Sequence, residues 1–351
     1  RQGRVLLVLD GLDEVVDTLN GESSTGRMLR CLVKSPYVLM TSRPLSNLEL
    51  VTRHGVFDRE IENHGFLPKD VHAYVERQFQ AVLAAHFIQV LKQQPFLYDL
   101  ARVPLMLHLL CCLWRQAGEE NRAALSEVWG QGYTAIYRQV IADFVHYANE
   151  RKTRQNQIAQ EGRVRAQEKI LEQSDAWLSF LSELAYRGFT SPENKLAIEP
   201  GVIRDTQRAR GDGICLNDAL HSGLLQALGS GDDDPLSVPY EFLHLTLQEY
   251  LVAQHIKHVL MQDEMTEEFL IFLRGQRYVR KWEYVWRFLA GQLREGQTDS
   301  EALARRRFWQ AIVWARPYEY TGIGSLRLLG LCLEETRGRH PLCANWEQQW
   351  I

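Results

Sequence analysis

The chain has 351 residues, of which 45% are hydrophobic and 24% charged, a composition typical of a globular protein with two or three domains. Its formal net charge of −4 gives no indication of a nucleic-acid partner, and no apolar run approaches the roughly 20 residues that a membrane span needs. The six cysteines lack paired metal-ligand spacing and indicate a reducing, intracellular compartment, so we predict a cytoplasmic protein.

The first predicted element is a strand over residues 5–9, which are apolar without interruption and are followed by Asp10, Asp13 and Glu14. Such a run favours a strand buried on both faces of a parallel sheet, where ligands bind beyond the carboxyl ends of the strands. A carboxylate at that edge can hold Mg²⁺ against a nucleotide's phosphates, and a second acid can orient or deprotonate an attacking water. The alternative is a buried strand that ends in an ordinary Asp-Gly turn.

A short helix is predicted at residues 27–34, and a second buried strand begins at Tyr37 and turns polar up to Arg43. Pro44 cannot continue a central strand and so marks its exit. An arginine at this position can reach a terminal phosphate and stabilise charge on it. The alternative is a surface arginine in a strand-end loop. A third, weaker strand is predicted around residues 58–61.

Beyond residue 66 the pattern becomes helical. A helix is predicted from Pro68 through Val82, and the helix that starts at Pro104 is apolar nearly all round, as in an interior. Helical patterns continue over residues 126–148 and 174–187, whereas residues 188–213 are predicted to form loops.

The order of elements from residue 218 outlines a winged-helix unit. A helix is predicted at residues 218–228, a turn at 229–235, a short strand at 238–244 and a helix at 246–260. Winged helices often bind DNA, but no basic or recognition-like segment stands out here. The remainder is helical and rich in aromatics, which we assign to a core rather than to a base-stacking platform because few basic residues interleave them.

Four segments resemble motifs of the NACHT-type STAND nucleotide switches, relatives of the animal NOD-like receptors and of bacterial defence and signalling proteins. Residues 6–14 (LLVLDGLDE) resemble the NACHT form of the Walker B motif, and residues 38–44 (VLMTSRP) resemble its sensor 1 strand. Residues 103–114 (VPLMLHLLCCLW) are similar to the proline-bearing helix of the first helical domain. Residues 241–256 (EFLHLTLQEYLVAQHI) resemble the winged-helix motif whose histidine touches the nucleotide.

The resemblance implies roles for the acids. Asp10 would serve the Mg²⁺ site of an ATP- or ADP-binding protein. Asp13 and Glu14 would be water-activating or switch-stabilising acids, with Glu14 as the catalytic base of a slow ATPase.

The resemblance also implies three contacts to the nucleotide. Arg43 would sense the γ-phosphate, Pro104 would pack near the adenine, and His244 would bond to the β-phosphate of ADP through a ring N–H. A lone histidine such as His244 is otherwise more often a satisfied structural residue.

The implied fold class is α/β followed by mostly α. Residues 1–66 would be the C-terminal part of a P-loop NTPase parallel sheet, 67–125 a first helical domain, 126–260 a winged-helix domain, and 261–351 a second helical domain or the start of repeats. The chain departs from the family because it holds no G-x-x-x-x-G-K-[ST] phosphate loop. We therefore expect a fragment that starts after Walker A and binds nucleotide poorly by itself.

The resemblance implies a switch that oligomerises on activation and triggers an attached effector, as in innate immunity or anti-phage defence. The effector is expected upstream, and the trigger ligand is unknown. One alternative is an AAA+-like ATPase motor or remodeller, which shares the two strand motifs but has a different lid domain. Another is a helical scaffold that has lost nucleotide binding.

Overall fold

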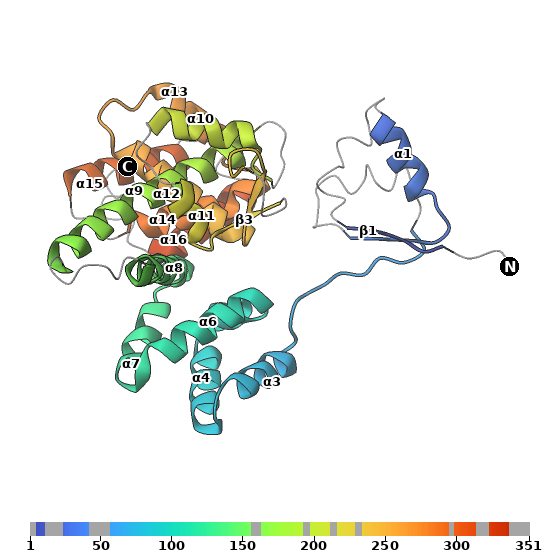
Figure 1. The fold of residues 1–351 in the computed structure, drawn as a ribbon, viewed down its shortest axis with the longest axis horizontal. Coiled ribbons are helices and arrows are strands. Elements are labelled where there is room, and N and C mark those ends of the chain that lie inside the picture. Colours follow the sequence, from blue (N-terminus) through green and yellow to red (C-terminus); the bar gives the residue numbers. More distant parts are fainter. Residues whose placement is uncertain are drawn as a thin grey trace, which may run out of the picture. The chain divides into compact units, whose positions relative to one another are not determined.

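The computed structural model describes residues 5–10, 24–41, 57–155, 163–191, 197–210, 216–228, 234–294, 298–313 and 323–336. These residues are mostly helical, with two small sheets of two strands each (Figure 1). They form two compact units, and the boundary between the units lies between His64 and Gly65. The further domain boundaries expected at residues 125 and 260 stay predictions.

The first unit contains β1 (Leu7–Leu9), α1 (Ser24–Val33) and β2 (Val38–Met40). The two strands are parallel, as predicted, and Leu7 pairs with Val38 while Leu9 pairs with Met40. The helix predicted between them is also confirmed, and it buries Leu29 and Val33.

Two predictions about this unit are wrong. The strands are not buried on both faces, because Val8 is 61% exposed and Leu39 51% exposed, while their neighbours along each strand are half-buried. A two-stranded sheet with α1 as the described helix of the unit leaves one face uncovered. Residues 57–67 form no strand, and Ile61 is 79% exposed, since no described strand pairs with this segment.

The second unit begins with a group of short helices: α3 (Pro68–Gln78), α4 (Ala81–Gln93), α5 (Pro95–Ala101), α6 (Pro104–Gln116) and α7 (Gly118–Trp129). A break after Gln78 divides the helix predicted from Pro68 through Val82. Helix α6 is an interior helix, as predicted, with six buried residues. The rings of Phe87, Trp114 and Trp129 pack together with centroids 5.3 to 6.2 Å apart.

Within the described residues, no single helix combines the length and apolarity of a membrane span. Helices α5 and α6 reach that length and apolarity only when they are taken together, and this pair is bent by 114° at the break between them.

The middle of the unit contains the strand predicted at residues 238–244 and the helix predicted after it, and a further strand pairs with the first of these. It consists of α8 (Tyr133–Gln155), α9 (Arg163–Thr190), α10 (Pro200–Arg210), α11 (Leu216–His221), the antiparallel strands β3 (Leu225–Ala227) and β4 (Tyr240–Phe242), and α12 (Leu245–Met261). Helix α12 packs against α9, α14 and α15 and is buried along most of its length (Figure 1).

Two further predictions fail in this region. The loop expected at residues 188–213 contains α10, which buries only Ile203 and Thr206, so its apolar pattern is too sparse to detect. The helix expected at residues 218–228 ends at His221, and Gly223 adopts a positive φ of 80°. Glycine reaches that conformation without strain and ends the helix before β3.

The C-terminal helices are α13 (Glu267–Gly275), the 3-10 turn η3 (Arg280–Trp282), α14 (Glu283–Gln292), α15 (Asp299–Val313) and α16 (Ile323–Thr336). Most of their aromatics lie in the core, as predicted: Trp282, Trp286, Phe288, Phe308 and Trp309 are buried. Phe272, Tyr278 and Tyr284 are exposed, so the core assignment is wrong for these three.

Helices α8 and α14 approach each other through a glycine. A Cβ on Gly291 of α14 would collide with Thr134 of α8, 2.5 Å from its Cβ, whereas a Cβ on Gly330 of α16 would meet nothing within 4 Å. We expect Gly291→Ala to lower the free energy of unfolding by about 1–3 kcal/mol through overpacking. Gly330→Ala should raise it by about 0.5–1 kcal/mol because alanine is the better helix former. Urea unfolding of both variants measures this, and a neutral Gly291→Ala would contradict the close approach.

The contact between α9 and α12 contains a half-buried histidine. His255 stacks on Tyr186 with ring centroids 4.7 Å apart. Burial lowers the pKa of His255 to about 4, although Glu183 acts in the opposite direction, and Arg210, His258 and Arg187 add to the lowering.

Since the pKa of His255 in the folded state lies below its ordinary value of 6.5, its contribution to stability is complete above pH 6.5 and is lost as the pH falls towards 4. Between pH 7 and pH 5 we expect a loss of about 1–2 kcal/mol. Thermal unfolding across this range measures the loss, and His255→Phe, which keeps a ring on Tyr186, should reduce the pH dependence. An equal pH dependence in parent and variant would exclude His255 as its source.

Candidate functional site

The carboxyl ends of the two parallel strands bring two predicted motifs together. Asp10 follows β1 directly and Thr41 follows β2 directly. The Thr41 hydroxyl donates a hydrogen bond to Asp10 Oδ1, and the Thr41 N–H donates to the Leu9 carbonyl at 2.9 Å. Both residues are exposed, so the Asp10 carboxylate is held by a neighbouring hydroxyl and faces solvent. Such a carboxylate can bind Mg²⁺ directly or through water.

The other acids and the arginine of this edge lie outside the described residues. These are Asp13, Glu14 and Arg43. Among the described residues, no three histidine, cysteine, aspartate or glutamate side chains gather as a metal site. Asp10 is therefore the described residue to which the magnesium prediction applies.

Pro104 lies at the first position of α6, on the surface of the second unit. Its missing N–H costs the helix nothing there, because the first N–H groups of a helix have no partner within the helix. The exposed ring could pack against a flat ligand such as a nucleobase.

His244 is the N-cap of α12, with extended backbone dihedrals and a half-buried side chain. Its Nδ1 accepts the Thr246 N–H at 3.2 Å and lies 2.7 Å from the Thr246 hydroxyl. A ring nitrogen that accepts a backbone N–H carries no proton, so the proton of the neutral imidazole lies on Nε2. The donor of the His244 ring is therefore Nε2–H, and the residue stands at a helix N-terminus, where the helix dipole favours anions.

A buried tyrosine supports this histidine from another helix. The Tyr137 hydroxyl of α8 donates to the Thr246 hydroxyl at 2.7 Å, which leaves the threonine proton for His244 Nδ1. Burial raises the pKa of Tyr137, so it stays a donor. We call Tyr137, Thr246 and His244 the histidine relay. Tyr137 precedes Thr246 by 109 residues, and the sequence around it carries no local sign of this contact.

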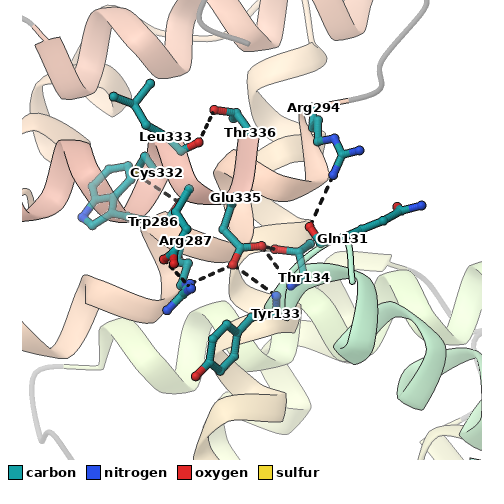
Figure 2. A network of polar contacts seen from close by, with 11 residues as sticks. Gln131, Tyr133, Thr134, Trp286, Arg287, Arg294, Cys332, Leu333, Glu335 and Thr336 are labelled. Atoms are coloured by element: carbon teal, nitrogen blue, oxygen red, sulfur yellow. Dashed lines mark hydrogen bonds and ion pairs between the residues drawn. The ribbon is translucent and has the colours of Figure 1, made fainter. Parts of the chain in front are cut away.

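A second polar group joins α16 to the start of α8 (Figure 2). Glu335 is 2% exposed. Its Oε2 accepts two hydrogen bonds from Thr134, one from the backbone N–H at 3.0 Å and one from the hydroxyl at 2.8 Å. Its Oε1 accepts the Tyr133 N–H at 3.2 Å and Arg287 Nε at 2.8 Å. The carboxylate thus caps the N-terminus of α8, where unpaired N–H groups and the helix dipole favour a negative charge. We call Glu335 with these three partners the Glu335 anchor.

The sequence contains one sign of this anchor. Glu335 follows Leu328 by seven positions and Cys332 by three, so it shares their buried helix face. A carboxylate on an apolar stripe needs partners, although the sequence alone does not say which.

Two cavities in the second unit lie away from the residues predicted to contact the nucleotide. A cavity of about 10 Å³ beside the Glu335 anchor has room for about one water molecule. An open groove of about 730 Å³ between α3 and α4 is lined by residues such as His72, Glu76 and Lys92. Neither contains Pro104 or His244.

No model of a known protein family matches the sequence, and no curated protein matches it. The structure by itself defines a mostly helical protein with few short strands. Its described site features are a carboxylate at the edge of a parallel strand pair and a histidine at a helix N-terminus.

Proposed function

We propose that this chain is part of a nucleotide-dependent switch of the NACHT/STAND class, which oligomerises on activation and triggers an attached effector. The observation that carries the proposal is the contact between Asp10 and Thr41 at the carboxyl edge of β1 and β2. In parallel sheets this edge is where nucleotides bind, and a carboxylate held by a hydroxyl from the next strand suits a Mg²⁺ bound to ATP or ADP. Arg43 follows Thr41 by two residues, and Asp13 and Glu14 follow Asp10 closely in sequence.

The second unit would supply the clamp. His244 Nε2–H would donate to the β-phosphate of ADP, and Pro104 would contact the adenine. A donor supplied by a separate unit ties the position of that unit to the nucleotide. ATP and ADP then favour different arrangements because they bind the two arrangements differently.

The proposal needs a phosphate loop that residues 1–351 do not contain. The first test is therefore the reading frame that encodes the chain. An intact G-x-x-x-x-G-K-[ST] ahead of residue 1 supports the switch. A degenerate or missing loop would overturn it in favour of a helical scaffold.

In the full-length protein, we expect His244→Ala to speed ADP release by about tenfold or more, the effect of losing a hydrogen bond to a charged group. The variant should also raise basal activation. Chase of a fluorescent ADP analogue with unlabelled ADP measures the release rate.

Since His244 also caps α12, His244→Asn is needed beside it, because asparagine keeps a capping acceptor. Both variants should release ADP faster, and only the alanine variant should lose stability, by about 1 kcal/mol. The exposed His258 of the same helix provides the control His258→Ala. Unchanged ADP release in His244→Ala counts against the clamp.

For the catalytic base, we expect Glu14→Gln to lower ATP turnover by about 10²–10⁴-fold while ATP stays bound, because the amide cannot accept the proton of water. The retained ATP should favour the oligomer. Phosphate release and light scattering measure the two effects. If the variant turns over ATP as fast as the parent, Glu14 is not the base. Steady turnover by the parent without any trigger would favour the AAA+-like alternative.

A further inference from the structure

One turn of α8 makes polar contacts with two helices that come much later in the sequence. At its start, Glu335 of α16 accepts the N–H groups of Tyr133 and Thr134. One turn further on, the Tyr137 hydroxyl reaches Thr246 at the start of α12. Tyr137 stands three and four positions after the two anchored residues, so the contacts lie on neighbouring parts of one helix face.

A third helix, α14, contacts both Glu335 and Tyr137. Its Arg287 donates to Glu335 at 2.8 Å. Its Phe288 packs on Tyr137 with ring centroids 4.7 Å apart, and its Gly291 lies so close to α8 that a Cβ would collide. Interiors packed this closely transmit displacement, because there is no empty volume to absorb it. The position of α16 therefore bears on the position of the Tyr137 hydroxyl.

This series of contacts, from Glu335 through Tyr137 and Thr246, ends at the imidazole ring of His244 and bears on which ring nitrogen carries the proton. While Thr246 donates to Nδ1, the proton lies on Nε2, where it can be given to a phosphate. In the other tautomer the proton lies on Nδ1, and Nε2 becomes an acceptor that repels a phosphate oxygen. The Thr246 N–H and the Thr246 hydroxyl both favour the first tautomer, and Tyr137 sets the orientation of the hydroxyl.

We propose that α16 regulates His244: while Glu335 holds the N-terminus of α8, the histidine relay directs the Thr246 hydroxyl to Nδ1 in addition to the Thr246 N–H and strengthens the preference for the Nε2–H tautomer, and release of Glu335 weakens that preference. The effect on ADP rests on the proposed function of His244. The tautomer itself is a property of the chain without nucleotide, and so it can be tested separately.

The tautomer is measured from the nitrogen-15 chemical shifts of the His244 ring. The sample is the nucleotide-free 351-residue chain, labelled at histidine, at a pH above the ordinary histidine pKa. Loss of the signal in His244→Gln assigns it. Tyr137→Phe removes the hydroxyl and keeps the ring, and it should raise the ratio of Nδ1–H to Nε2–H about fivefold, the effect of one neutral hydrogen bond. Tyr250→Phe makes the same change in the same aromatic cluster, where the hydroxyl pairs with Arg138, and should leave the ratio unchanged.

Glu335→Gln tests the remote step. An amide presents N–H groups to the N–H groups of α8, so the anchor should loosen and the ratio should shift in the same direction as in Tyr137→Phe. Glu334→Gln is the matched control, because Glu334 also pairs with Arg287, at 2.7 Å, but its side chain is 60% exposed. Thr134→Val removes one donor to Glu335 and keeps the side-chain shape, and it serves as the second variant if Glu335→Gln does not fold.

A shift in Tyr137→Phe together with a shift in Glu335→Gln or Thr134→Val, and none in the two controls, supports the proposal. An unchanged ratio in Tyr137→Phe overturns the relay. An unchanged ratio in folded Glu335→Gln or, where that variant does not fold, in Thr134→Val overturns the regulation by α16. Because no nucleotide is present, these results stand whether or not the protein binds ADP.

Discussion

The buried carboxylate of Glu335 is the interaction on which the arrangement of the second unit depends. Its two oxygens receive four donors, from Tyr133, Thr134 and Arg287. A buried charge without such partners would cost roughly several kcal/mol, so an arrangement that separates Glu335 from these donors is strongly disfavoured. The anchor thereby fixes the start of α8 against α14 and α16, and Gly291 makes this approach possible. Helices α14 and α16, which carry no predicted site residue, thus determine where the start of α8 stands.

Each unit positions its own predicted site residue by a different kind of local order. In the first unit, parallel pairing of β1 and β2 places Asp10 beside Thr41 at one edge. In the second unit, His244 is held as the N-cap of α12, and the buried Tyr137 hydroxyl on α8 donates to Thr246, the partner of His244. A histidine in a capping position accepts a helix N–H at one ring nitrogen and carries its proton on the other. This division of labour makes it suited both to structure and to recognition of an anion, and it reconciles the two interpretations that a lone histidine allows.

The sequence predicts well what short-range periodicity specifies. The paired strands, the interior helix α6, the long α12 and most of the aromatic core follow from apolar spacing. Prediction from the sequence fails where the apolar periodicity is weak, or where a distant partner determines the local structure. Helix α10 buries only two residues, and the segment around Ile61 has no described strand to pair with. For the site, the sequence indicates Asp10 and His244 through their motifs, whereas Tyr137 and Glu335 act on partners more than 100 residues away in sequence. One sequence does not record such pairings.

The capping of α8 by a distant carboxylate has a consequence for the order of folding. Most helices are capped by a side chain next to their first turn, which is available as soon as the helix is synthesised. Helix α8 receives its cap from a residue 201 positions after Thr134. During synthesis from the N-terminus, its first N–H groups stay without this partner until almost all of the described chain has emerged. This cap therefore forms late in the folding of the described residues, and a ribosome-bound chain that stops before Glu335 lacks it at the first turn of α8.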